Sequence, residues 1–206
     1  MPTFAMSNCW TRPGSASSPA FAEMRAAQAV AGRQTDSMSA FHEDEHVIVV
    51  HLLAPGDAAN EQAFVRGLTP ETRYRRFQQA ITDLTPAMLR RLLDNDGEQP
   101  MACVATVAIG GVEQEVGVAR YAVDADERTA EFAIVVSDEW SRRGVGTRLM
   151  QQLIAHARGR GLRELRGFLR AENDAMLELM RHQGFRLLRE AGEPGVLIAS
   201  LALRDD

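Results

Sequence analysis

Cysteine is scarce in this sequence, and neither of its two cysteines belongs to a recognisable motif. Cys9 lies in a segment of small and polar residues, and Cys103 lies in the apolar run of residues 101–109. No Cys/His group has the spacing of a metal site, so no bound metal is expected. His42 and His46 stand beside acidic residues in an unpatterned stretch, which favours solvated side chains. We interpret Cys103 as a small core residue and not as a catalytic thiol.

Long apolar runs are also missing. No stretch is long enough to span a bilayer, and Arg12 is not followed by the apolar segment of a secretory signal. We therefore expect a cytoplasmic protein without a membrane partner. The net charge of -5 and the pI near 5.6 argue against a protein whose main task is to grip nucleic acid, because phosphate neutralisation needs a basic face.

The length and composition are those of one globular domain with some additional chain. The sequence has 206 residues, of which 45% are hydrophobic and 25% charged, enough for a core of ordinary size. Residues 1–45 are rich in Ala, Ser, Gly and Met, which predicts a poorly ordered extension with one short helix at residues 21–31. Residues 46–206 are predicted to form the folded domain.

Within that domain the hydrophobic period changes several times. The first half is a strand followed by helices, with Thr-Pro helix starts at Thr69-Pro70 and Thr85-Pro86. The second half is a meander of three strands, then helix, strand, helix and two strands. The predicted strands are 46–53, 101–109, 113–123, 129–136, 164–170, 185–189 and 196–203, and the predicted helices are 58–68, 70–77, 86–93, 144–160 and 173–183. This order predicts an α+β fold with a mixed sheet.

The most informative segment is VVSDEWSRRGVGTRL at residues 135–149, in which a strand leads through a loop into an amphipathic helix. Gly144 and Gly146 let a ligand approach the backbone closely. The first amides of a helix have no internal partners and, with the helix dipole, form an anion site suited to a pyrophosphate. Arg142, Arg143 and Arg148 add positive charge there. The segment lacks the Gly-Lys-Ser/Thr of a P-loop and the glycine spacing of a dinucleotide fold.

The segment RRGVG, Arg142 to Gly146, resembles the acetyl-CoA loop of the GNAT superfamily of N-acetyltransferases, whose pattern is Gln/Arg-x-x-Gly-x-Gly/Ala. It follows a strand and opens a helix as that family requires, and the order of elements agrees over residues 46–203. Ser141 stands where the family has Gln or Arg, a departure that backbone binding should tolerate. The resemblance implies a mostly antiparallel central sheet that splays at a bulge, with helices on both faces.

The resemblance also implies a cosubstrate, acetyl-CoA, and residues that would bind it. Ile134, Val135 and Val136, on the strand that splays from its neighbour, would hold the acetyl and pantetheine end. The pyrophosphate would lie on the loop residues Arg142, Arg143, Gly144, Val145, Gly146 and Thr147. Asn173, which opens the helix before Gly184-Phe185, would contact the pantetheine region, and it also suits an N-cap.

Acyl transfer to an amine requires a base, because an alkylamine arrives protonated at neutral pH. Glu131 is the one carboxylate inside the strand 129–136, on the same face as Ala133 and Val135. Burial among apolar residues would raise its pKa toward neutrality; a glutamate that reaches solvent from the strand end is the alternative. Similar GNAT enzymes with an Ala-Glu-Phe/Ile strand use this Glu as base.

The tyrosine that acts as general acid in many GNAT enzymes is missing here. Its position, four residues before Gly184, is occupied by Met180. Tyr121 is a weak substitute that suits strand packing better. The departing thiolate would then leave without an acid, take its proton from water, or use a donor elsewhere.

A finer resemblance is to bacterial Pat-type protein-lysine acetyltransferases. It rests on residues 68–77 (LTPETRYRRF), on the strand Ala130-Glu131-Phe132, and on Ala171-Glu172-Asn173. It implies an acyltransferase that moves an acetyl group to a protein lysine by direct attack in a ternary complex. Arg73, Arg75 and Arg76 could dock an acidic protein surface or simply form a solvated helix face. A small-molecule amine acetyltransferase and a non-catalytic acyl-CoA-binding module remain as alternatives.

Overall fold

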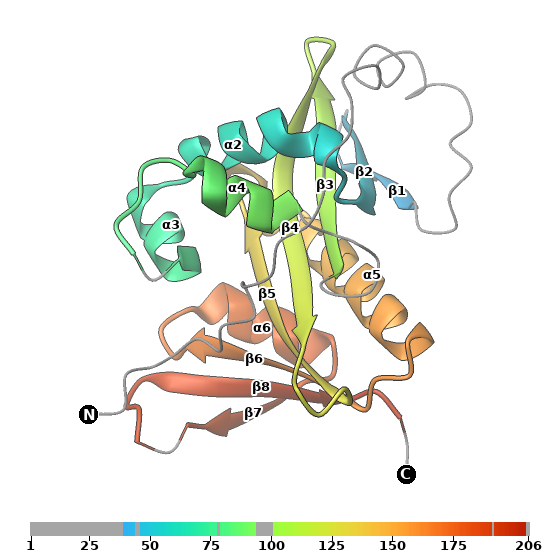
Figure 1. Cartoon of the computed structure of the whole chain (residues 1–206), viewed down its shortest axis with the longest axis vertical. Helices are drawn as coiled ribbons and strands as arrows, with labels where there is room; N and C mark the ends of the chain where they lie inside the picture. The colour runs from blue at the N-terminus through green and yellow to red at the C-terminus, as the bar shows by residue number, and fades with distance from the viewer. Residues whose placement is uncertain (1–38, 44–45, 78, 94–100, 191, 205–206) are drawn as a thin grey trace.

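The computed structural model describes residues 39–43, 46–77, 79–93, 101–190 and 192–204. The predicted helix at residues 21–31, the predicted loop at 94–100 and Cys9 lie outside the described residues. Figure 1 shows the described chain as one curved sheet with helices against both of its faces.

The sheet has eight strands in the order β1-β2-β3-β4-β5-β6-β8-β7. Every neighbouring pair is antiparallel except β5 and β6, which are parallel. The strands are β1 (Ser39–Glu43), β2 (His46–Leu52), β3 (Met101–Ile109), β4 (Val112–Val123), β5 (Thr129–Val136), β6 (Glu164–Arg170), β7 (Arg186–Arg189) and β8 (Val196–Ala202). The predicted α+β class with a mixed, mostly antiparallel sheet is confirmed.

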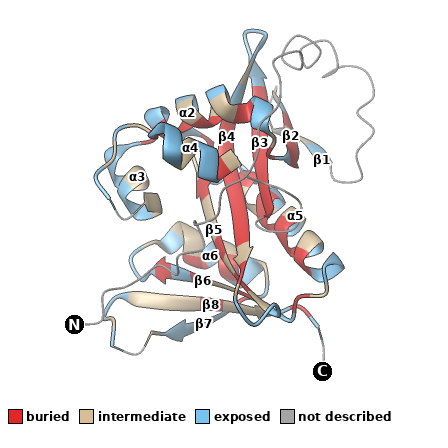
Figure 2. Ribbon diagram, viewed as in Figure 1, coloured by how far each residue is buried: buried red, intermediate tan, exposed pale blue. Residues whose placement is uncertain are grey.

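Two hydrophobic clusters sandwich this sheet. On one face α2 (Ala58–Gly67) and α4 (Pro86–Leu93) pack through Phe64, Val65 and Leu92. On the other face α5 (Val145–Gly159) and α6 (Asp174–His182) pack through residues that include Leu149, Leu153, Leu177 and Met180. The remaining elements are α3 (Pro70–Phe77) and the short 3-10 turns η2 (Pro55–Asp57) and η3 (Asp138–Trp140). Figure 2 shows the buried centre along β3 and β4.

The predicted helix starts are confirmed in hydrogen-bonding detail. The Oγ1 atom of Thr69 accepts from the N–H of Thr72 at 3.3 Å, and Oγ1 of Thr85 accepts from the N–H of Met88 at 3.2 Å. Each hydroxyl thereby satisfies one of the amides that a helix leaves unpaired at its first turn. None of the helices in the described part of the chain reaches the length and apolar content needed to cross a membrane.

Strand β1 corrects the predicted start of the folded domain. Ser39–Glu43 pairs antiparallel with β2, from Ser39 opposite Val50 to Glu43 opposite His46. The described part of the sheet therefore extends to Ser39, seven residues before His46 and inside the segment 1–45 that the sequence predicts to be poorly ordered. The residues SAFHE have little strand propensity of their own, and strand formation there depends on pairing with the open edge of β2.

The feature that shapes the site is the separation of β5 from β6. The two strands are paired only at Thr129 with Glu164, Ala130 with Leu165, and Glu131 with Arg166. Beyond that point β6 stays with β8 while β5 stays with β4 (Figure 1). The predicted splay is thus present. The register shift of the sheet lies between β3 and β4, at Ala105/Thr106.

Candidate active site

A cavity of about 820 Å³ opens where β5 and β6 part. Its walls come from four places: the open edge of β5, the outer half of β6 with the start of α6, the loop that leads into α5, and helix α3. Glu131 and eight of the predicted cofactor-binding residues line it: Ile134, Val135, Val136, Arg142, Gly144, Gly146, Thr147 and Asn173. Residues that are far apart in the sequence therefore meet at one cavity.

One end of the cavity is formed by the loop that leads into α5, and its backbone has the geometry expected of an anion site. Gly144 caps α5 with a left-handed backbone (φ 77°), and Arg142 also has positive φ (63°). The first hydrogen bond of the helix runs from the N–H of Arg148 to the carbonyl of Gly144, so the preceding amides have no intrahelical acceptor and remain available to a ligand. A non-glycine residue in the left-handed region is strained by about 1–3 kcal/mol, a cost typical of functional loops.

Two of the residues predicted to bind the pyrophosphate, Arg143 and Val145, do not line the cavity. The Val145 side chain is buried in the core at 1% exposure, so only its backbone amide can serve a ligand. The guanidinium of Arg143 lies over the Trp140 ring, 5.4 Å from its centroid, and that of Arg148 lies 5.4 Å from the centroid of Phe41. These arginines flank the loop and add to its positive field without lining the cavity.

Gly146 marks the place where three elements converge. A Cβ atom there would lie 3.0 Å from Cδ2 of Leu179 on α6, 3.7 Å from Cγ2 of Val136 and 3.9 Å from Cδ1 of Ile134 on β5. Because Gly146 has no side chain, α6 and β5 can approach the start of α5 closely at this point, and Gly146 itself lines the cavity.

The edge of β5 beyond Glu131 has no strand partner on the β6 side in the described structure. Unpaired backbone groups on such an edge can bind an extended amide-containing ligand as an added strand would be bound. The Oδ1 of Asn173 accepts from the N–H of Met176 at 3.3 Å, which confirms the predicted N-cap of α6. The residue also lines the cavity, and its contact with the pantetheine region stays a prediction.

Glu131 lies at the last paired position of β5 and β6, half-buried in the cavity wall. Burial raises the pKa of its carboxyl group, the negative charge of Asp124 raises it further, and the positive charge of Arg166 lowers it. The net shift is upward, as expected for a base that must exchange protons near neutrality.

Three other groups considered for chemistry lie in the core. Tyr121 is 1% exposed, and its hydroxyl is 2.7 Å from Nδ1 of His156, so it packs the strand as predicted. Met180 is fully buried. Cys103 is also fully buried, and burial raises the pKa of its thiol to about 12, which confirms the core interpretation. Among the described residues, the cavity lining includes no tyrosine and no cysteine.

The prediction missed the side of the cavity formed by β6. Arg166, Phe168 and Arg170 alternate along that strand and line the cavity, as does Glu193 before β8. Their spacing of two residues was visible in the sequence and places them on one face. It did not reveal that this face meets Glu131, because that depends on the parallel pairing of β5 with β6.

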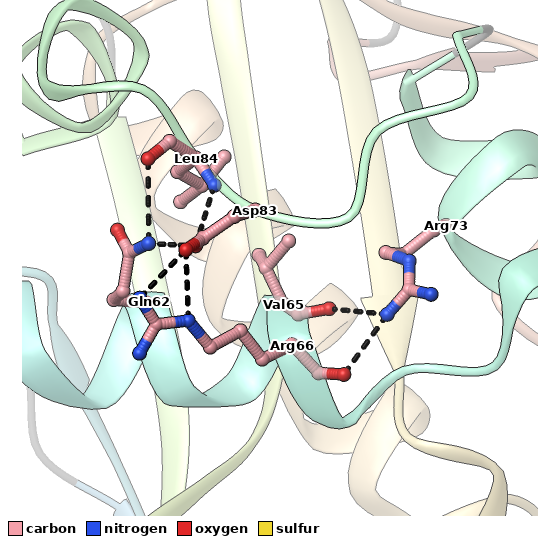
Figure 3. A network of polar contacts seen from close by, with 6 residues as sticks. All are labelled: Gln62, Val65, Arg66, Arg73, Asp83 and Leu84. Carbon is pink, nitrogen blue, oxygen red and sulfur yellow. Dashed lines mark hydrogen bonds and ion pairs between the residues drawn. The ribbon is translucent and has the colours of Figure 1, made fainter.

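Helix α3 closes the cavity on its remaining side. Thr72, Arg75 and Arg76 line it, and the Thr72 hydroxyl donates to Oδ1 of Asp138 at 3.0 Å, which ties α3 to the loop before α5. The network in Figure 3 fixes α3 against α2: Nη1 of Arg73 donates to the carbonyl of Arg66 at 2.9 Å and to that of Val65 at 3.3 Å.

The same network fixes the connection that follows α3. Asp83 accepts from Arg66, with Nη2 at 2.6 Å from Oδ2, and from Gln62 (Figure 3). Arg73, treated in the sequence as a candidate docking residue, thus anchors the helix. Arg75 and Arg76 face the cavity. Within the described part of the chain, no group of three or more His, Cys, Asp or Glu side chains could hold a metal ion.

Comparison with known proteins agrees with this geometry. The family model for the acetyltransferase (GNAT) family matches residues 62–185. Acetyltransferase PA5475 of Pseudomonas aeruginosa is 35% identical over 161 residues, which is 78% of this chain and 87% of that protein. Acetyltransferase Pat of Mycolicibacterium smegmatis is 31% identical over 137 residues, 66% of this chain, and the match spans 40% of Pat.

Solved structures show the same fold. The GNAT domain of S. lividans PAT superposes with a TM-score of 0.73 at 23% identity, covering 83% of this chain and 99% of that domain. The structure of yncA from Salmonella typhimurium with its cofactor acetyl-CoA gives a TM-score of 0.59 at 16% identity, covering 77% and 95%. With the matched family model and the relative from P. aeruginosa, the conclusion is that this chain belongs to the GNAT family of acetyltransferases.

Proposed function

We propose that the chain transfers the acetyl group of acetyl-CoA directly to a primary amine in a ternary complex, and that the amine is a lysine of another protein. The observation that carries the proposal is the position of Glu131. Its half-buried carboxylate lies in the same cavity as the helix amides of α5 and the open edge of β5. A base, an anion cradle and a strand edge are the three parts that this reaction needs.

Each part has a defined task. The loop from Arg142 to Thr147 and the start of α5 hold the pyrophosphate of the cosubstrate, and the open edge of β5 at Ile134–Val136 takes its amide-containing arm. Glu131 removes the proton from the ammonium form of the acceptor, directly or through water, as the amine attacks the thioester carbonyl. A backbone N–H on the same edge would donate to the carbonyl oxygen. Because Met180 stands in place of the tyrosine and is in the core, the tetrahedral intermediate collapses without a tyrosine acid. The C–S bond breaks, the nitrogen releases its second proton to water, and the departing CoA thiolate takes a proton from water.

Two observations support a protein lysine as acceptor. The match to Pat of M. smegmatis is one. The other is the composition of the cavity lining on the sides of α3 and β6, which includes Arg75, Arg76, Arg170 and Phe168; the exposure of Phe168 is 37%. Arg75 and Arg170 are paired with Glu71 and Glu172, and exchange of these partners for carboxylates of another protein suits an acceptor with acidic residues near the target lysine. We retain the cytoplasm as the expected location from the sequence analysis.

The test is acceptor-dependent release of CoA from acetyl-CoA, with acyl-CoA synthetases and small amines as candidate acceptors. Glu131→Gln should lower turnover by about 10²–10⁴-fold while acetyl-CoA affinity stays close to that of the wild type. Glu139→Gln is the matched control, because Glu139 is an exposed carboxylate that does not line the cavity, and it should leave turnover unchanged. Mass spectrometry then locates the acetyl group.

The composition of the chain excludes acetylation of the enzyme's own lysines as a background in this assay. All 23 basic residues other than histidine are arginine, so the protein contains no lysine. Every acetyl-lysine in the reaction must therefore come from the acceptor. If CoA is released with small amines but with no protein acceptor, the acceptor is a small molecule and not a protein lysine. Tight acetyl-CoA binding with wild-type-like release in Glu131→Gln would refute the assigned base.

A further inference from the structure

We propose that Asp124 is a positioning residue that draws Arg166 away from Glu131 and so keeps Glu131 available as a base. The proposal rests on the function proposed above, because it concerns how the catalytic carboxylate is kept free. Glu131 and Arg166, the last paired residues of β5 and β6, would then act in the reaction as well as in the sheet.

The strand register creates the problem that Asp124 would solve. Glu131 and Arg166 are register partners at the point where the parallel strands separate, so their side chains leave the same face of the sheet. Neighbouring strands lie about 4.8 Å apart, and opposite charges on paired positions attract each other. Without another partner, the guanidinium of Arg166 would form an ion pair with Glu131, and a paired carboxylate is a poor proton acceptor.

Asp124 instead provides that partner. Nη2 of Arg166 donates to Oδ2 of Asp124 at 2.9 Å. Asp124 is itself fixed in the turn between β4 and β5: its Oδ2 accepts from Oγ1 of Thr129 at 2.7 Å, and its N–H donates to the carbonyl of Thr129 at 2.8 Å. The Asp124 side chain is 17% exposed and that of Arg166 is 41% exposed, so solvent reaches the pair from the arginine side and screens it in part.

Glu131 is left unpaired as a result. Its carboxylate makes no hydrogen bond and no ion pair with the residues that the structure describes, although Arg166 is adjacent to it. The Nε of Arg166 is buried and likewise finds no acceptor among them. Arg166 therefore keeps a donor that could turn to Glu131 once Asp124 no longer holds the other end of the guanidinium.

No other residue of β5 is charged. The charged or titratable groups of the neighbouring elements are Asp124 and Arg166 themselves, Arg75 and Arg76 on α3, Asp138 and Arg142 in the segment before α5, Arg170 on β6, Glu178 and His182 on α6, Glu193 before β8, and Arg120 on β4, whose Nη2 lies 3.5 Å from Oε1 of Glu61. Burial is the largest cause of the raised pKa of Glu131; the charge of Asp124 raises it further and that of Arg166 lowers it. With burial unchanged, the balance between these two charges determines how readily Glu131 gains or loses its proton.

The sign of each substitution follows from that balance. In Asp124→Asn a negative charge disappears and Arg166 is released toward Glu131, and both changes lower the pKa of Glu131. The acid limb of kcat/KM should move to lower pH by about 1 unit, and the rate on the plateau should fall, because a weaker base accepts the proton less readily. In Arg166→Gln the opposing positive charge is removed, so the acid limb should move to higher pH.

The experiment is the pH profile of acceptor-dependent CoA release for Asp124→Asn, Arg166→Gln and the double variant, each first shown to bind acetyl-CoA. Opposite shifts in the single variants, with the double variant lying between them, support the proposal. Asp126→Asn is the control: Asp126 accepts from the N–H groups of Arg128 and Thr129, both at 2.9 Å, in the same turn. It should leave the limb in place.

The outcomes separate this proposal from the one on which it rests. Two results overturn the role of Asp124 if Glu131→Gln still abolishes turnover. Either the acid limb of the pH profile stays in place in both single variants, or it moves in the same direction in both. A Glu131→Gln variant with full turnover overturns both proposals. Should Asp124→Asn fail to fold, Asp124→Ser takes its place, with the same downward shift expected and an unmoved acid limb overturning the role of Asp124.

Discussion

Gly167 is the position at which the shape of the site can be tested most directly. It lies on β6 immediately after the last residue paired with β5. A Cβ atom there would lie 2.7 Å from Cε1 and Cζ of Phe132 and 3.0 Å from its Cδ1. The ring cannot easily move, because Phe132 is 4% exposed and packs edge-on against Phe185, with centroids 5.2 Å apart. Gly167→Ala should therefore overpack the point where the strands part.

The expected cost follows from two opposing effects. Forcing a methyl group into a packed core costs about 1–3 kcal/mol, whereas replacing glycine by alanine stabilises by about 0.4–1 kcal/mol through the unfolded chain. The free energy of unfolding should therefore fall by about 1–2 kcal/mol, which lowers the Tm by about 2–8 °C for a chain of this size. Acetyl-CoA should also bind more weakly, because Phe132 lines the cavity.

Urea unfolding followed by circular dichroism measures the effect. Gly159→Ala is the matched control: Gly159 is the last residue of α5, and a Cβ there would meet nothing within 4 Å, so this variant should be as stable as the wild type or more so. Adding Phe132→Leu to Gly167→Ala should recover part of the loss, so that the two changes are not additive. Unchanged stability in Gly167→Ala, or strict additivity in the pair, would refute the packing argument.

Two further predictions concern other parts of the fold. Gly144→Ala should lower the free energy of unfolding by about 1–2 kcal/mol, because its φ of 77° strains any residue with a Cβ. Steric overlap does not contribute, since the nearest atom to that Cβ, in Phe41, is 3.8 Å away. Urea unfolding measures the effect, and Arg142→Gly should raise the free energy of unfolding. Burial and the charge of Glu61 raise the pKa of Glu115. The native state thus retains a proton that the unfolded state releases, and stability falls as pH rises above the unfolded pKa. Glu115→Gln should remove that decline, so its advantage in thermal unfolding should appear at neutral and alkaline pH and vanish in acid.

The sequence alone determined the local chemistry of this protein. The caps at Thr69 and Thr85, the glycines at 144 and 146, and the alternation around Glu131 are short-range signals, because they depend on backbone geometry within a few residues. They were enough to predict the α+β class, the order of the strands after His46, the loop that opens α5, and the position of the carboxylate that we assign as the base.

Only the tertiary structure decided what surrounds that carboxylate. Strand β1 forms because it pairs with β2, not because of its own propensity. Arg166 follows Glu131 by 35 residues, and only the parallel pairing of β5 with β6 brings the two residues together. The contact of Arg166 with Asp124 depends on the same strand pair. The local hydrophobic periodicity of the sequence does not predict such contacts, because strand register is fixed by the packing of the whole sheet.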